Sequence, residues 1–223
     1  MTVPKPHLQE HRLTVSRSAR VQVLGDAEGA REVWIVIHGF GQLAADFITP
    51  FAPVAGPDRV VVAPEALNRF YKERAGATRS ADRPVGATWM TREDREAEIG
   101  DYVAYLDAVA AHFARGRPLT VLGFSQGVAT LVRWVALGRA VPSRVIAWAG
   151  EIPADVDLRE HRGRFPGAGL DLVMGTTDEY VQWVNVDEMH RRLEGASLPF
   201  RVHTFDGGHR LDRQTLLALA GNR

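Results

Sequence analysis

The sequence predicts an α/β fold in which a mostly parallel central sheet carries helices on both faces. Two patterns predict it: short apolar runs that stop at glycine or proline recur along the chain, and stretches with a helical period separate them. A third observation, 223 residues with 45% hydrophobic side chains, fits one domain with a large buried core. We therefore expect residues 1–223 to form a single domain whose parallel strands are joined by right-handed crossovers.

Most of the predicted strands are continuous apolar runs, the pattern of strands that are buried on both faces of a parallel sheet. The earlier stretch Arg12–Leu24 alternates apolar and polar residues, so we expect an antiparallel edge hairpin or strand pair with one wet face. The apolar runs are Val33–Ile37, Val60–Ala63, Leu119–Leu122, Val145–Ala149 and Leu170–Met174, and a further strand is expected at Phe200–Phe205.

Helices are predicted where apolar residues recur every three or four positions. Thr91 and Asp94 resemble a capping box just ahead of the first such stretch. The segment Glu65–Arg92 has no clear period, and we expect it to be an irregular loop near the active site. The predicted helices cover Ile99–Phe113, Val128–Val135, Tyr180–Leu193 and Leu211–Leu219.

The composition excludes several classes of function. Because 27 basic residues balance 27 acidic ones at a pI near 7.1, the basic surplus typical of nucleic-acid-binding proteins is missing. The chain has no cysteine, which excludes disulfides and thiolate metal sites, and no apolar run is long enough to span a membrane. The polar stretch Met1–Arg20 lacks the apolar segment of a signal peptide, so we expect a cytoplasmic protein.

The strongest chemical motif is the G-x-S-x-G string Gly123-Phe124-Ser125-Gln126-Gly127. A predicted strand runs into it and a predicted helix leaves it, which is the context of a nucleophile elbow rather than of an ordinary turn. Such a turn exposes the Oγ of Ser125 and places the backbone N–H of Gln126 at a helix N-terminus, where it can stabilise an oxyanion. We expect Ser125 to be the nucleophile.

A serine nucleophile needs a histidine base and an acid that orients it. Asp178 follows the predicted strand that ends at Met174, and His209 follows the one that ends at Phe205. This order, serine then acid then histidine, brings the three side chains to the same sheet edge. We therefore expect Ser125, Asp178 and His209 to form a catalytic triad.

Other side chains compete for these roles. Glu151 follows the preceding strand and is the alternative orienting acid. His203 alternates within a predicted strand, which favours a structural role. His190 lies beside Arg191 and Arg192 in a predicted helix, which favours a solvated surface position.

The second oxyanion donor is expected from the loop after the first long buried strand, which reads His38-Gly39-Phe40-Gly41-Gln42. Its two glycines allow the N–H of Phe40 to face the site. A zinc-peptidase string, His7-Leu8-Gln9-Glu10-His11, follows two prolines and runs into a strand pattern, so we do not expect it to bind zinc. No phosphate-binding glycine loop is present.

Together these motifs resemble the phospholipase/carboxylesterase family of α/β-hydrolases, which includes bacterial carboxylesterases and acyl-protein thioesterases. The resemblance covers roughly Val33 to the C-terminus, and Gly123–Gly127 is its most specific part. It implies a hydrolase without a large cap domain, with the triad Ser125, Asp178 and His209 and the backbone donors Phe40 and Gln126. It also implies that neither a metal nor a cofactor is required.

The sequence departs from this family between Pro64 and Arg92, where the relatives build their acyl pocket. Here we expect pocket residues Phe70, Tyr71, Trp89 and Met90, whose bulk favours short to medium acyl chains. The expected partner is a small-molecule ester, and a homodimer is left open. A thioesterase or lysophospholipase with the same triad is one alternative. A non-catalytic α/β-hydrolase used to bind a ligand is the alternative of another class.

Overall fold

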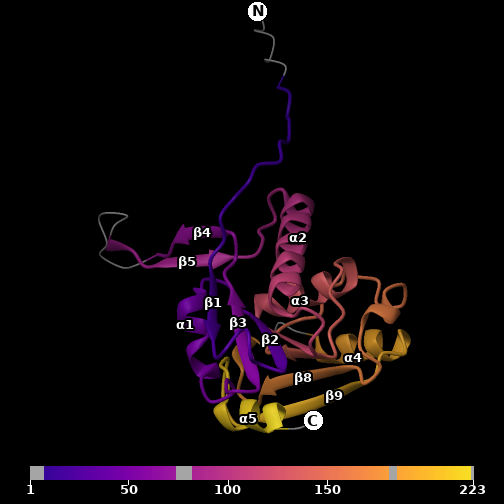
Figure 1. The fold of residues 1–223 in the computed structure, drawn as a ribbon. Helices are drawn as coiled ribbons and strands as arrows, with labels where there is room; N and C mark the ends of the chain where they lie inside the picture. The colour runs from indigo at the N-terminus through magenta and orange to yellow at the C-terminus, as the bar shows by residue number, and fades with distance from the viewer. Residues whose placement is uncertain (1–7, 74–81, 181–184, 222–223) are drawn as a thin grey trace, which may run out of the picture.

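The computed structural model describes residues 8–73, 82–180 and 185–221, and it has the α/β architecture that the sequence predicts. A seven-stranded sheet runs through the molecule (Figure 1). Only its first strand is antiparallel to its neighbour, and the other neighbours pair in parallel. In spatial order the strands are β1 (Val21–Leu24), β3 (Arg59–Pro64), β2 (Glu32–Ile37), β6 (Leu119–Phe124), β7 (Arg144–Trp148), β8 (Leu170–Gly175) and β9 (Phe200–Phe205).

Helices cover both faces of the sheet, and two core clusters lie beneath them. Along β2, Val33, Ile35 and Ile37 enter one cluster while Trp34 and Val36 enter the other. The first cluster contains side chains of α2 (Arg95–Phe113), α3 (Gln126–Leu137) and α4 (Val186–Gly195). The second contains side chains of α1 (Ala44–Phe47) and α5 (Arg213–Gly221). Burial on both faces explains why the strands read as continuous apolar runs.

The strand at the edge of the sheet covers fewer residues than the predicted stretch Arg12–Leu24. Residues 8–20 form no strand, and the short strand β1 is by itself the outer neighbour of β3. The alternating side chains Leu13 and Val15 are 86% and 77% exposed, because no neighbouring strand or helix covers them. Arg12 instead reaches Asp94, with 2.6 Å between Nη2 and Oδ1.

Several helix boundaries also differ from the expectation. The helix α2 begins at Arg95 behind Asp94, whose φ of +48° and lack of a side-chain cap bond rule out the predicted capping box. The helix α4 begins at Val186, because the side chain of Asn185 accepts a hydrogen bond from the N–H of Glu188. Residues 181–184 of the predicted helix lie outside the described residues, as does His7.

The segment Glu65–Arg92 is not irregular throughout. It contains the strands β4 (Asn68–Tyr71) and β5 (Val85–Thr88), which pair as a two-stranded antiparallel sheet. This pair, called the hairpin below, projects away from the main sheet (Figure 1). Its strands are short and do not alternate cleanly, and its anchoring contacts come from distant parts of the chain, so the sequence pattern did not reveal them.

Candidate active site

Ser125 lies on a tight turn between β6 and α3. Its φ of +54° and ψ of −120° are rare for a residue with a side chain and indicate a strained backbone. The surroundings leave no room for larger neighbours: a Cβ on Gly123 would lie 2.3 Å from the carbonyl oxygen of Gly127. A Cβ on Gly150 would lie equally close to the carbonyl oxygen of Ser125. The glycines of the motif are therefore required by close backbone packing around the serine.

His209 and Asp178 meet at the ends of the two last strands of the sheet. The Nδ1 of His209 lies 2.9 Å from Oδ2 of Asp178, and the carboxylate side chain is 1% exposed. The other carboxylate oxygen accepts the N–H of Tyr180 at 2.9 Å. Because a carboxylate oxygen accepts, this contact fits the tautomer of His209 with the hydrogen on Nδ1, which leaves the lone pair on Nε2.

The turns that carry these two side chains are held together by their backbones. A Cβ on Gly175 would lie 2.2 Å from the carbonyl oxygen of Gly207, and the N–H of Thr177 donates to that oxygen at 3.0 Å. This close approach fixes the spacing between the acid and the imidazole. A larger residue at position 175 would force the two turns apart.

Two aromatic rings hold the imidazole of His209 beside the serine turn. The ring of Phe124, the residue before Ser125, lies 4.9 Å from it between centroids. The ring of Tyr180 lies 4.3 Å away. The structure thus joins two of the three predicted triad side chains, His209 and Asp178, and it places the imidazole against the residue that precedes Ser125.

The loop after β2 lies against the serine turn. A Cβ on Gly39 would lie 3.1 Å from the Cβ of Ser125. Within the described residues, the backbone N–H groups of Phe40 and Gln126 donate no hydrogen bond, so both are available to an oxyanion. The loop is braced by Gln42, whose Oε1 accepts the N–H of Gly39 at 2.7 Å.

The buried side chain of His38 links the same loop to the start of the segment after β3. His38 is 0% exposed; its Nδ1 lies 2.8 Å from the carbonyl oxygen of Gly39, and its Nε2 accepts the N–H of Ala66 at 3.0 Å. Burial lowers the pKa of His38 below its usual value, outweighing the hydrogen bond to Gly39 and the charge of Glu65. The neutral ring therefore satisfies both contacts with one fixed tautomer.

The side chain of Gln126 has a role that the sequence did not indicate. Its Oε1 accepts the N–H of Trp89 at 3.2 Å, and its Nε2 donates to the carbonyl oxygen of Met90 at 3.1 Å and to Oγ1 of Thr88 at 2.9 Å. The residue after Ser125 thus anchors the end of β5. No local pattern could show this, because the partners are 36 to 38 positions away.

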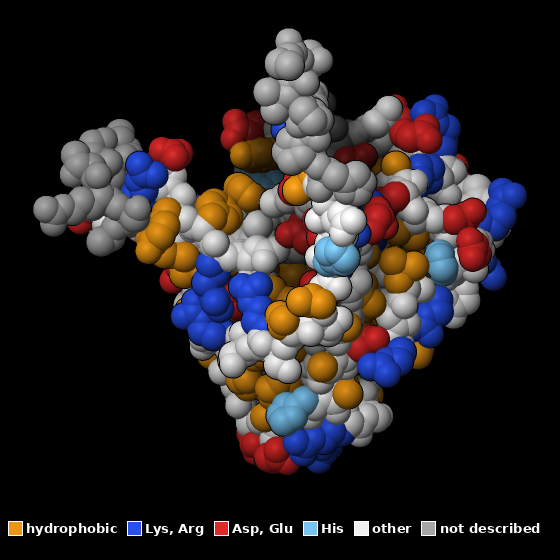
Figure 2. Space-filling model, turned by 90° about the horizontal axis from the view of Figure 1, so that it is seen from above, with side chains coloured by type: hydrophobic (Ala, Val, Ile, Leu, Met, Phe, Trp, Pro, Cys, Tyr) orange, Lys and Arg blue, Asp and Glu red, His pale blue; other side chains and the backbone are white. Residues whose placement is uncertain are grey.

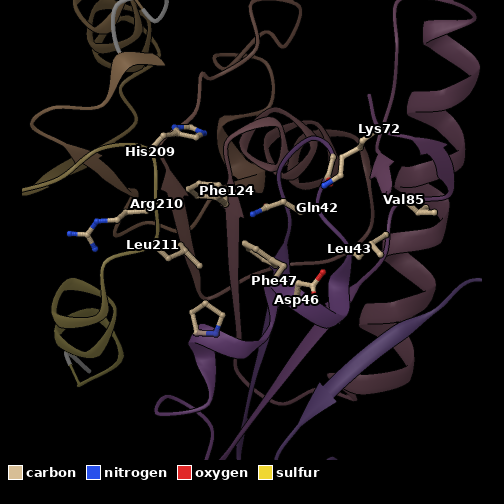
Figure 3. A pocket seen from close by; sticks show the side chains of 12 residues that line it. Gln42, Leu43, Asp46, Phe47, Lys72, Val85, Phe124, His209, Arg210 and Leu211 are labelled. Carbon is tan, nitrogen blue, oxygen red and sulfur yellow. The ribbon is translucent and has the colours of Figure 1, made fainter. Parts of the chain in front are cut away.

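A cavity of about 480 Å³ opens beside His209 (Figure 3). Apolar side chains and a few charged ones share its walls. Phe124 and His209 connect it to the candidate triad. The remaining lining residues come from the loop after β2, from α1 and its neighbourhood, from the hairpin and from the turn before α5: Gly41, Gln42, Leu43, Asp46, Phe47, Pro50, Lys72, Val85, Arg210 and Leu211.

The four predicted pocket residues do not line this cavity. Trp89 is 2% exposed in the core, and its Nε1–H donates to the carbonyl oxygen of His38 at 2.9 Å. Met90 contacts Arg133, with 3.4 Å between Sδ and Nη1. Phe70 stacks on Phe40 at 5.0 Å between centroids, and Tyr71 is 54% exposed. Figure 2 shows exposed hydrophobic side chains gathered along the hairpin.

The competing side chains lie elsewhere. Glu151 is exposed and takes part in no hydrogen bond or ion pair among the described residues. The Nε2 of His203 lies 2.9 Å from Oδ1 of Asp171, a contact between the neighbouring strands β9 and β8 that fits a structural role. His190 is half-buried and stacks on Phe200 at 4.8 Å, so the expectation of a solvated surface position was wrong.

Comparisons of the sequence with known proteins find no match: no model of a known protein family matches the chain, and no curated protein matches its sequence. Among the part of the chain that the structure describes, no helix is long and apolar enough to cross a membrane.

Solved structures match closely in fold. An esterase named PE8 has 21% sequence identity and a TM-score of 0.64, over 91% of this chain and 96% of that one. Acyl-protein thioesterase 2 from Zea mays has 15% identity and a TM-score of 0.66 over the same shares. A phospholipase/carboxylesterase from Dyadobacter fermentans has 18% identity and a TM-score of 0.61, over 94% and 98%. The chain therefore has the α/β-hydrolase fold that these structures share.

Proposed function

We propose that this protein is a serine hydrolase that cleaves carboxylic esters through an acyl-enzyme intermediate. The observation that carries the proposal is the 2.9 Å contact between His209 and Asp178, made beside a strained serine turn. The two unpaired N–H groups of Phe40 and Gln126 add the second requirement of acyl transfer, an oxyanion site. Structural similarity to solved esterases and a thioesterase agrees with this chemistry.

Each residue has a defined part in the proposed reaction. Oγ of Ser125 attacks the ester carbon while Nε2 of His209 takes its proton, and the carbonyl electrons move to the oxygen held by the two N–H groups. The tetrahedral intermediate then collapses: the bond to the alcohol oxygen breaks, and His209 returns the proton to that oxygen. Water repeats the attack on the acyl-serine, which releases the acid and restores Ser125.

The cavity favours acyl chains of short to medium length. Its apolar walls include Phe47, Phe124 and Leu211, which can bury methylene groups at about 0.8 kcal/mol each. That gain stops where the wall ends, and a volume of about 480 Å³ accommodates a small ligand. A thioester of similar acyl size would fit the same machinery and is the alternative within this mechanism.

The first experiment asks whether the serine is activated. A fluorophosphonate probe should label the wild-type protein and should fail to label Ser125→Ala. The matched control is Ser143→Ala, since Ser143 bonds to Leu119 on another part of the sheet and should keep its labelling. If the wild-type protein stays unlabelled and turns over no ester, it is a ligand-binding protein with this fold rather than an enzyme.

The second experiment identifies the substrate class. Values of kcat/KM for p-nitrophenyl esters from C2 to C16 should rise over the first carbons and then level or fall. Acyl-CoA thioesters of the same lengths form the parallel series. A higher kcat/KM throughout the thioester series would reassign the protein as a thioesterase.

A further inference from the structure

The candidate active site contains an amine whose charge nothing described in the protein neutralises. Only two of the 27 basic residues are lysines, Lys5 and Lys72, and Lys72 lines the cavity beside His209. It is half-buried at the end of β4, where its N–H donates to the carbonyl oxygen of Pro84. Its Nζ donates to the carbonyl oxygen of Gly41 at 3.2 Å.

This contact places the positive charge next to the loop His38–Gln42 after β2, which is called the oxyanion loop below because it contains the expected donor Phe40. Gly41 follows Phe40, the expected oxyanion donor, and a Cβ on Gly41 would lie 3.6 Å from Cδ of Lys72. In Figure 3 the amine points toward the middle of the cavity. An ammonium group has three donors, so one bond to Gly41 leaves two for a ligand.

No acidic partner occupies those donors. Within residues 8–73, 82–180 and 185–221, no carboxylate lies within 4.0 Å of the amine, and the remaining residues include no Asp or Glu. Glu73, the nearest acid in sequence, pairs with Arg83. Asp46 lines the same cavity and is exposed, and it too has no ion-pair partner among the described residues.

The other basic residue of the cavity is already engaged. Arg210 binds Asp212, with 3.0 Å between Nη1 and Oδ1, and its Nη2 donates to the carbonyl oxygen of Asp206 at 3.1 Å. Its guanidinium lies over the ring of Phe205, and in Figure 3 it points away from the cavity. Of these two basic side chains, Lys72 is therefore the one whose charge points into the cavity.

We propose that Lys72 forms a subsite for a carboxylate carried by the ester substrate, an inference that rests on the ester hydrolase activity proposed above. A carboxylate on the acyl or alcohol part would accept charge-assisted hydrogen bonds from the amine while the ester carbonyl occupies the oxyanion site. The preferred substrates are then monoesters of dicarboxylic acids or esters of carboxylated alcohols. Partial burial of the amine keeps salt from screening the charge completely.

The test compares isosteric substrates that differ in charge. Aryl monoesters of glutaric acid are paired with the corresponding glutaramates, in which a carboxamide replaces the carboxylate. A second pair, 4-carboxyphenyl and 4-carbamoylphenyl butyrate, moves the charge to the alcohol side. The variants are Lys72→Gln, Lys72→Glu and the control Lys5→Gln, the same change at the other lysine.

In at least one pair, the ratio of kcat/KM for the carboxylate to that for the carboxamide should fall about tenfold in Lys72→Gln. It should fall further in Lys72→Glu and stay at the wild-type value in Lys5→Gln. Asp46→Asn should raise the ratio, because it removes a repelling charge. Added salt should lower the wild-type ratio.

A ratio that is unchanged in both Lys72 variants, while carboxamide esters are still cleaved, overturns the carboxylate subsite and leaves the hydrolase proposal intact. Equal losses on both members of a pair also overturn it and assign Lys72 to bracing the oxyanion loop. If no ester is cleaved, the hydrolase proposal fails first. Calorimetry on Ser125→Ala then decides the subsite, because the carboxylate ester should bind more tightly than the carboxamide only while Lys72 is present.

Discussion

Gly86 of the hairpin packs so closely on Gly41 of the oxyanion loop that a Cβ on Gly86 would lie 2.7 Å from the carbonyl oxygen of Gly41. The two segments also exchange backbone hydrogen bonds, from Gly41 to Ala87 at 2.8 Å and from Ala87 to Gln42 at 3.3 Å. The hairpin is therefore part of the support of the candidate active site. Moving it displaces the N–H of Phe40.

This relationship predicts the effect of a single methyl group. Gly86→Ala should lower kcat on a p-nitrophenyl ester by about ten- to a hundredfold, because small displacements of catalytic groups are costly. Unfolding in urea should change little, since the hairpin lies outside the main sheet. The matched control is Gly100→Ala, where the added Cβ meets nothing within 4 Å. Equal activity of the two variants would contradict the supporting role of the hairpin.

The two candidate acids can be separated by matched substitutions. Asp178→Asn should lower kcat by about 10⁴-fold, because an amide at this position favours the wrong tautomer of His209. Glu151→Gln should leave kcat within about twofold, since an exposed side chain without a hydrogen bond contributes little to a site. Ester hydrolysis by both variants at one pH checks this. The reverse ranking would transfer the orienting role to Glu151.

The buried carboxylate of Asp171, in β8, predicts how stability depends on pH. Burial alone would raise the pKa of Asp171. Hydrogen bonds from Arg201, His203 and Arg144 lower it by more than burial raises it, so the pKa falls to about 2. In the unfolded chain the pKa is near 3.8. The stabilisation is therefore complete above pH 3.8 and is lost as pH falls toward 2.

Asp171→Asn should accordingly lower the free energy of unfolding by about 2 kcal/mol at pH 7, because it leaves the paired arginines partly buried. The difference between wild type and variant should shrink as pH falls below about 4. Urea titrations at pH 7, 5 and 3 measure it. Asp101→Asn is the control, since the exposed carboxylate of Asp101 takes part in no hydrogen bond or ion pair among the described residues. A difference that grows on acidification would show that Asp171 is not ionised in the folded protein.

The fold and the contact between Asp178 and His209 could be predicted from the sequence because each depends on a local pattern. Continuous apolar runs mark strands buried on both faces, and Asp178 and His209 follow the ends of such runs. The walls of the cavity could not be predicted in the same way. Lys72 and Val85 reach it only because the hairpin folds onto the oxyanion loop, and the contacts that hold it there link residues far apart in sequence.

Trp89 shows most clearly why the walls of the cavity could not be predicted from the sequence. Its bulk suggested a wall of the acyl site, but its indole is buried and bonded to the carbonyl of His38, beneath the loop rather than in the cavity. In a segment without a helical or strand period, an aromatic side chain can pack in the core or line a pocket. The path of the backbone determines which of these occurs, and here that path is set by hydrogen bonds to Gln126 of α3.

The position of Trp89 predicts how acyl-chain preference responds to substitution. Trp89→Ala should lower the free energy of unfolding by about 3–5 kcal/mol by creating a cavity in the core, and it should reduce turnover of every ester. It should not move the optimum toward longer chains. Val85→Trp, in contrast, should change the acyl-chain preference, because Val85 lines the cavity and is 36% exposed.

A larger ring at position 85 shortens the apolar wall, so kcat/KM should fall most for the longest esters, by about fourfold for each methylene that loses its contact. Profiles of kcat/KM from C2 to C16 for wild type, Trp89→Ala and Val85→Trp decide the matter. Val141→Trp is the control, since Val141 is exposed and lies at another cavity. A shift of the optimum in Trp89→Ala but not in Val85→Trp would move the acyl site from this cavity to the space beneath the oxyanion loop.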